Sequence, residues 1–115
     1  MAEVVTLARI GQVGVVKIDN PPVNALSAAV RRGLWQALAL AEADPEVAAV
    51  VLAAEGRTFP AGADITEFGR PPEPPTLPEL CNRIEAFPRP VVACLTGTAL
   101  GGGFELALAA HWRLA

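Results

Sequence analysis

The sequence contains little of what several classes of protein require. One histidine and two cysteines occur in 115 residues, and Cys81 and Cys94 have no C-x-x-C spacing, which argues against a usual zinc site. The net charge of −3 offers no basic surface to nucleic acid or to anionic lipid. No apolar run reaches the roughly 20 residues of a membrane-spanning helix, and the acidic, alternating stretch 1–11 is unlike a signal peptide. We therefore expect no metal, no nucleic-acid partner, no membrane partner and two reduced core cysteines.

Apolar residues make up 52% of the sequence, enough for a substantial core in one domain or in part of a larger one. The runs 4–10 and 13–18 are rich in β-branched residues and are separated at Gly11, which predicts a hairpin. The segment 28–44 has apolar residues at helical spacing, with Ser27 as a suitable N-cap. The predicted apolar face consists of Val30, Leu34, Leu38 and Ala41, and we expect Arg31, Arg32 and Glu42 elsewhere on the helical wheel.

The rest of the sequence alternates between strand and helix patterns. Continuous apolar runs at 47–56 and 91–97 predict buried strands. The proline-rich stretch 70–80 is expected to be irregular, and the pattern over 77–87 predicts a helix. In that helix we expect Leu80, Ile84 and Phe87 to share one buried side. Further predictions are a short helix capped by Asp64, a helix over 101–111 and a strand beginning at 112. This alternation indicates the α/β class.

The glycine-rich stretch 97–103 stands between a predicted strand and a predicted helix, a common arrangement for binding a negative oxygen. A P-loop is excluded, because Phe104 and Glu105 stand where Lys and Ser or Thr are required. A dinucleotide fingerprint is matched only loosely and late in the chain. An oxyanion hole is the third alternative, with Gly102 as one N–H donor and a second donor from the stretch 60–64.

Each of these residues also has a plain structural interpretation. The glycines allow close packing of helix on strand, and Glu105 complements the helix dipole in a first turn. Asp64 caps a helix, and His111 interacts with a helix C-terminus. Taken singly, each residue is better explained in this way, so the case for function depends on the segments together.

Three segments, "NPPVNALS" (20–27), "FPAGADITEF" (59–68) and "GTALGGGFELALAAHWRLA" (97–115), occur in this order and at these separations. Together they resemble the crotonase (enoyl-CoA hydratase/isomerase) superfamily over the whole chain. The paired prolines and the last segment look most like the hydratase part of multifunctional fatty-acid oxidation enzymes, in which a 3-hydroxyacyl-CoA dehydrogenase is fused to it. The resemblance implies the α/β spiral fold of ββα repeats, with residues 1–115 as the N-terminal part of the domain.

The resemblance also implies roles for individual residues. The backbone N–H groups of Ala63 and Gly102 would form the oxyanion hole for the thioester oxygen of an acyl-CoA. Glu105 matches the first of two catalytic glutamates and would hold and deprotonate the water that adds to a trans-2-enoyl-CoA. The implied substrate-binding residues are Val23, Ala25, Ala61, Gly62, Asp64 and Gly101.

In the family, the second glutamate and the trimer-forming C-terminal helices come after the segment that residue 115 closes. We therefore expect a truncated domain that is inactive alone, with homo-oligomers depending on the C-terminal region. The alternative is a catalytically incomplete CoA-binding or assembly module. We expect a CoA thioester as substrate, no tightly bound cofactor, NAD only where a dehydrogenase domain follows, and an additional Δ3-Δ2-enoyl-CoA isomerase activity. The expected location is the cytoplasm, or the peroxisome in a eukaryote.

Overall fold

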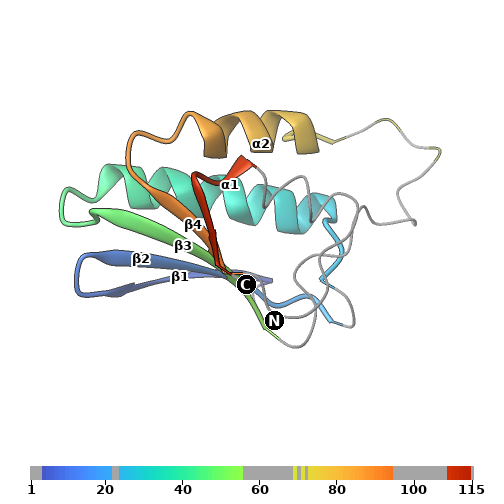
Figure 1. Cartoon of the computed structure of the whole chain (residues 1–115). Coiled ribbons are helices and arrows are strands. Elements are labelled where there is room, and N and C mark those ends of the chain that lie inside the picture. Colours follow the sequence, from blue (N-terminus) through green and yellow to red (C-terminus); the bar gives the residue numbers. More distant parts are fainter. Residues whose placement is uncertain are drawn as a thin grey trace.

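The chain starts with the predicted hairpin, in which β1 (Val5–Ile10) pairs antiparallel with β2 (Val13–Ile18). Gly11 lies in the turn at a φ of 60°, a left-handed conformation that favours glycine. This computed structural model describes residues 4–21, 24–55, 69, 71, 73–94 and 109–114. In those ranges a five-stranded sheet has the order β1-β2-β3-β4-β5, and its helices lie on one side of it (Figure 1).

The helix α1 (Ala28–Ala43) begins where the sequence predicted, because the side chain of Ser27 accepts a hydrogen bond from the N–H of Val30. The four residues of the predicted apolar face are all buried. The expectation for Arg31 was wrong: its side chain is buried, at 7% exposure, on the same side of the helix as the apolar residues. Carbonyl groups from another part of the chain bind its guanidinium there, so burial does not leave the charge without hydrogen-bond partners.

The remaining elements follow the predicted order, with shorter bounds. They are β3 (Ala49–Ala54), α2 (Leu77–Glu85), β4 (Val91–Cys94) and β5 (Trp112–Leu114). The strands from β2 to β5 are parallel to one another. The predicted short helix after Asp64 and most of the predicted helix over 101–111 lie outside the described residues. The mixed α/β class is confirmed for the described part of the chain.

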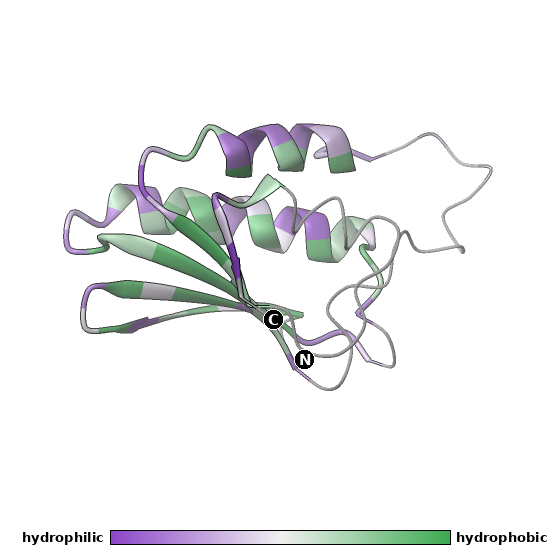
Figure 2. Ribbon diagram, viewed as in Figure 1, coloured by the Kyte–Doolittle hydropathy of each residue, from purple (hydrophilic) through white to green (hydrophobic). Residues whose placement is uncertain are grey.

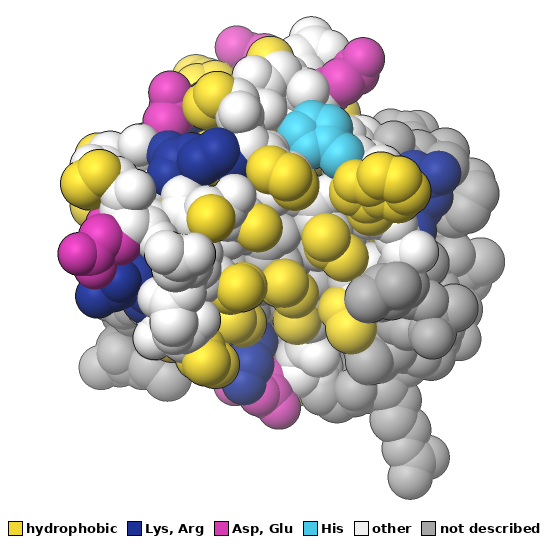
Figure 3. Space-filling view, turned by 60° about the vertical axis from the view of Figure 1, so that its left-hand side comes forward, with side chains coloured by type: hydrophobic (Ala, Val, Ile, Leu, Met, Phe, Trp, Pro, Cys, Tyr) yellow, Lys and Arg dark blue, Asp and Glu magenta, His cyan; other side chains and the backbone are white. Residues whose placement is uncertain are grey.

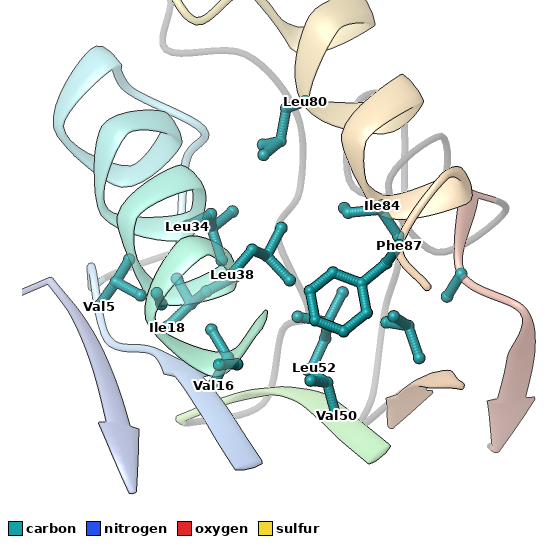
Figure 4. Close-up of a cluster of buried hydrophobic side chains, with 14 of the residues drawn as sticks. Val5, Val16, Ile18, Leu34, Leu38, Val50, Leu52, Leu80, Ile84 and Phe87 are labelled. Atoms are coloured by element: carbon teal, nitrogen blue, oxygen red, sulfur yellow. The ribbon is translucent and has the colours of Figure 1, made fainter. Parts of the chain in front are cut away.

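The hydrophobic core lies between the helices and the sheet (Figure 2). Figure 4 shows side chains from both helices pointing toward those of β2 and β3. The predicted common burial of Leu80, Ile84 and Phe87 is confirmed, although α2 ends at Glu85 and Phe87 follows it. The largest fully buried side chains also include Ile18, Leu34, Leu38 and Leu52. This packing holds both helices against one side of the sheet.

The opposite side of the sheet is apolar as well. One row across it pairs Val15 with Val51, Val51 with Val92, and Val92 with Trp112 in the strand register. The three valines are half-buried and Trp112 is 67% exposed, so the described helices do not cover this row. Figure 3 shows hydrophobic side chains gathered over the face turned to the viewer, with charged side chains at its margins.

Candidate active site

The three strands that precede the sequence motifs end on the same side of the sheet. β2 ends at Ile18 and β3 at Ala54, and these two residues are paired in the parallel register. β4 ends at Cys94 and runs parallel to β3 (Figure 1). The chain therefore enters each motif from the carboxyl end of a parallel strand. In α/β sheets, ligands bind outside such carboxyl ends.

Among the predicted site residues, Ala25 lies in the described part of the chain. It is half-buried between the end of β2 and the start of α1. The other calls lie outside the described residues and stay predictions: the oxyanion-hole pair Ala63 and Gly102, the catalytic Glu105, and the substrate-binding set Val23, Ala61, Gly62, Asp64 and Gly101.

A tight turn holds Ala25 in place. The carbonyl of Ala25 accepts hydrogen bonds from the N–H of Ser27 at 2.9 Å and from the side-chain amide of Asn20 at 3.0 Å. Asn24 has a φ of 54°, a conformation in which asparagine is enriched among non-glycine residues. Its side-chain oxygen accepts the N–H of Asn20 at 2.7 Å, which closes the turn. The backbone beside the predicted CoA contact is thus held by four residues of one short segment.

Asn24 also connects this turn to the next motif. Its side-chain nitrogen donates to the carbonyl of Glu55 at 2.9 Å, across 31 residues of sequence. Glu55 directly follows β3 and precedes the stretch that contains the predicted donor Ala63. Asn24 is 3% exposed, and its part-buried bond ties the turn to the residue that directly follows β3, four residues before the second motif begins.

Arg31 makes a second link of this kind. Its Nε donates to the carbonyl of Pro75 at 2.8 Å, one Nη to that of Glu73 at 3.2 Å, and the other Nη to that of Leu26 at 2.7 Å. It joins the residue after Ala25 to the segment that precedes α2. Sequence reasoning missed both links. For Arg31 a signal existed, since it stands four residues after Ser27 and three before Leu34, in line with the apolar face of α1.

An exposed ion pair lies at the same edge of the sheet. Lys17 Nζ is 2.8 Å from Glu55 Oε1. The hydrogen bond and the charge of Glu55 raise the pKa of Lys17 above its ordinary value. Among the described residues there is no group of three His, Cys, Asp or Glu side chains that could hold a metal ion. In the same residues no helix is long and apolar enough to cross a membrane.

Comparisons with known proteins agree with this arrangement. The family model for enoyl-CoA hydratase/isomerase matches residues 9–115. The chain is 50% identical to the peroxisomal bifunctional enzyme of Danio rerio over 103 residues, which are 90% of this chain and 14% of that protein. It is 44% identical to a probable enoyl-CoA hydratase of Bacillus subtilis, covering 90% of this chain and 43% of that protein.

Solved structures give the same result. The carnitinyl-CoA hydratase from Mycobacterium avium superposes with a TM-score of 0.87 at 35% identity, over 100% of this chain and 47% of that one. The chain thus spans less than half the length of these hydratases and about a seventh of the bifunctional enzyme. The predicted crotonase fold is confirmed, and the chain belongs to the enoyl-CoA hydratase/isomerase family.

Proposed function

We propose that this chain supplies the oxyanion hole and one catalytic carboxylate of an enoyl-CoA hydratase that acts in fatty-acid β-oxidation. The observation that supports it best is that β2, β3 and β4 are parallel neighbours, so that the three strands that precede the family motifs in sequence all end on the same side of the sheet. Relatives named as enoyl-CoA hydratase and as peroxisomal bifunctional enzyme support the same reaction.

In this proposal the N–H groups of Ala63 and Gly102 donate to the thioester oxygen of a trans-2-enoyl-CoA. The bonds withdraw electron density from the β-carbon and stabilise the enolate that forms when water attacks it. Glu105 accepts a proton from that water as its oxygen bonds to the β-carbon. A proton then reaches the α-carbon on the same face, which gives the 3-hydroxyacyl-CoA by syn addition.

The finer parts of the proposal rest on the family resemblance. We propose that a second carboxylate, which matches a position after residue 115 in relatives, transfers the proton to the α-carbon. We also propose that the 115 residues alone do not turn over substrate. A Δ3-Δ2-isomerase activity and a fused 3-hydroxyacyl-CoA dehydrogenase that uses NAD would accompany hydration in the complete gene product. We place it in the cytoplasm, or in the peroxisome of a eukaryote. The second candidate is a CoA-binding module without catalysis.

The test follows the loss of the enoyl thioester absorbance of crotonyl-CoA, with the complete gene product and with the 115-residue chain side by side. Hydration by the complete product and none by the chain supports the hydratase assignment and the inactivity of the 115 residues alone. Acyl-CoA binding by calorimetry without turnover in either protein supports the binding module. Binding of NAD but not of acyl-CoA at this site contradicts both.

A further inference from the structure

The two buried polar side chains of the described residues, Asn24 and Arg31, share one arrangement. Both come from the segment 24–31, which contains Ala25 and the start of α1. Asn24 binds the carbonyl of Glu55, and Arg31 binds the carbonyls of Glu73 and Pro75. These acceptors stand on either side of the stretch 56–72, where the chain leaves β3 and where it approaches α2.

We infer that Asn24 and Arg31 are positioning residues of the thioester site, a role that rests on the proposed function. We call them the anchoring pair. The pair ties both ends of one long connection to a single short segment. The predicted donor Ala63 belongs to that connection, and the predicted CoA contact Ala25 belongs to that segment. In this inference, the separation of donor and CoA contact depends on two part-buried sets of hydrogen bonds made by buried side chains.

The chemistry of the pair suits this task. The acceptors are backbone carbonyls, so the bonds locate the main chain itself and do not depend on the rotamer of a partner side chain. A guanidinium offers five N–H donors in a rigid fork, which lets Arg31 bind carbonyls from two separate segments at once. Asn24 offers a donor and an acceptor, and uses the donor on Glu55 and the acceptor on Asn20. Neither side chain needs to contact substrate.

A second arginine provides a matched control. The guanidinium of Arg89 also donates to three backbone carbonyls, those of Glu42, Asp44 and Val47. It is half-buried just before β4, and its acceptors precede β3, so it lies at the opposite edge of the sheet from the three motifs. Loss of Arg89 removes similar bonds without touching the anchoring pair.

The experiment compares Arg31→Gln, Asn24→Gly and Arg89→Gln in the complete gene product. Glycine at 24 keeps the left-handed backbone accessible, so the variant removes the amide bonds without adding strain. Because a small misplacement of an oxyanion donor weakens the transition state more than substrate binding, we expect kcat for crotonyl-CoA to fall roughly tenfold or more in both anchoring variants. KM should change less than kcat, and Arg89→Gln should keep kcat within about twofold of the natural protein.

Two further measurements separate a positioning role of Arg31 from a general loss of stability. Thermal unfolding shows whether Arg31→Gln and Arg89→Gln lose similar stability, and Arg31→Lys, which retains a cation with fewer donors, should give an intermediate kcat. Equal kcat losses at equal stability loss in Arg31→Gln and Arg89→Gln would reduce Arg31 to a structural role and overturn the inference.

Amide hydrogen exchange separates this inference from the proposed function. Arg31→Gln should speed exchange in peptides covering 24–27 and 73–77, whereas Arg89→Gln should not. If the natural protein does not hydrate crotonyl-CoA, the proposed function is wrong. The exchange rates then decide alone whether the anchoring pair positions the backbone. Unchanged exchange at both places would overturn the positioning role.

Discussion

His111 and Val91 are joined by a hydrogen bond in which the backbone N–H of Val91 donates to Nδ1 of His111 over 3.0 Å. The other ring nitrogen, Nε2, is 3.0 Å from the carbonyl of Glu85, to which it must donate because a carbonyl only accepts. These two bonds fit the tautomer that carries its proton on Nε2 and accepts at Nδ1. It connects the last residue of α2 to the first residue of β4 and to the segment just before β5. The sequence suggested a helix C-terminus as its partner, and the carbonyl that it binds belongs to α2.

Replacing His111 by leucine should lower the free energy of unfolding by about 1–3 kcal/mol, because the part-buried N–H of Val91 loses its acceptor. Asparagine is the control, since its side-chain oxygen can still accept this N–H while it cannot reach Glu85. We expect His111→Asn to lose less stability than His111→Leu in urea unfolding. Equal losses would mean that ring packing, and not the bond to Val91, carries the effect.

Gly33 stands in α1 where a side chain has no room. A Cβ at this position would lie 2.8 Å from Cβ and Cγ2 of Val5, on the strand β1 that the helix covers. Helix propensity alone would favour alanine by about 1 kcal/mol, but forcing the helix away from β1 should cost about 1–3 kcal/mol. We expect Gly33→Ala to lower the melting temperature, and Gln36→Ala, at an exposed site of the same helix, to leave it nearly unchanged. A higher melting temperature for Gly33→Ala would show that β1 moves away at little cost.

Local patterns predicted most of the described fold, because they act over a few residues. Gly11 between two β-rich runs is sufficient for a hairpin, and Ser27 before an apolar period is sufficient for the start of α1. The capping box of α2 is encoded locally as well, since Thr76 stands three residues before Glu79, within a stretch whose prolines indicate irregular structure.

The site was less predictable for a physical reason. The burial of Arg31 depends on carbonyls up to 44 residues away, and the role of Asn24 depends on a carbonyl 31 residues away. No local pattern encodes such partners, and an arginine in a helix is usually assigned to solvent. The site assignments rest on resemblance and on the chemistry of a glycine-rich helix start, and all of them except the substrate-binding residue Ala25 concern residues outside the described ranges.

The capping box makes a prediction about acid. The backbone N–H of Thr76 donates to the carboxylate of Glu79 at 2.9 Å, and this bond, together with a side-chain hydrogen bond from Thr76, holds the pKa of Glu79 below its ordinary value of 4.5. The backbone N–H of Glu79 donates in return to the hydroxyl of Thr76. A lowered folded pKa means that the carboxylate stabilises the fold above the unfolded pKa, and that this contribution is lost as pH falls through the folded pKa. Glu79→Gln keeps an acceptor but no charge. The natural chain should therefore be the more stable of the two at neutral pH.

The measurement is thermal unfolding of the two chains across the acid range. Their difference in melting temperature should shrink as pH falls below 4.5 and vanish once both side chains are neutral. If the difference in melting temperature persists unchanged to about pH 3, the shape of the side chain at position 79, and not its charge, causes that difference.

Glu105 carries the most specific prediction about catalysis. In the complete gene product, Glu105→Gln should lower the rate of crotonyl-CoA hydration by about 10²–10⁴-fold, since glutamine is similar in shape but takes no proton from water. Binding of the substrate should be nearly unchanged, because the proposed contacts to CoA and to the thioester oxygen come from backbone groups. Stopped-flow turnover and calorimetry with a saturated acyl-CoA measure the two separately.

Glu85→Gln, at an exposed position of α2, is the control for removal of one negative charge and should keep the natural rate. The outcome that matters most is the split between rate and affinity. A fall in affinity equal to the fall in rate would mean that Glu105 supports the binding site and not the proton transfer. An unchanged rate would leave it as a first-turn carboxylate that stabilises its helix through the dipole, the plain structural role that its position also fits.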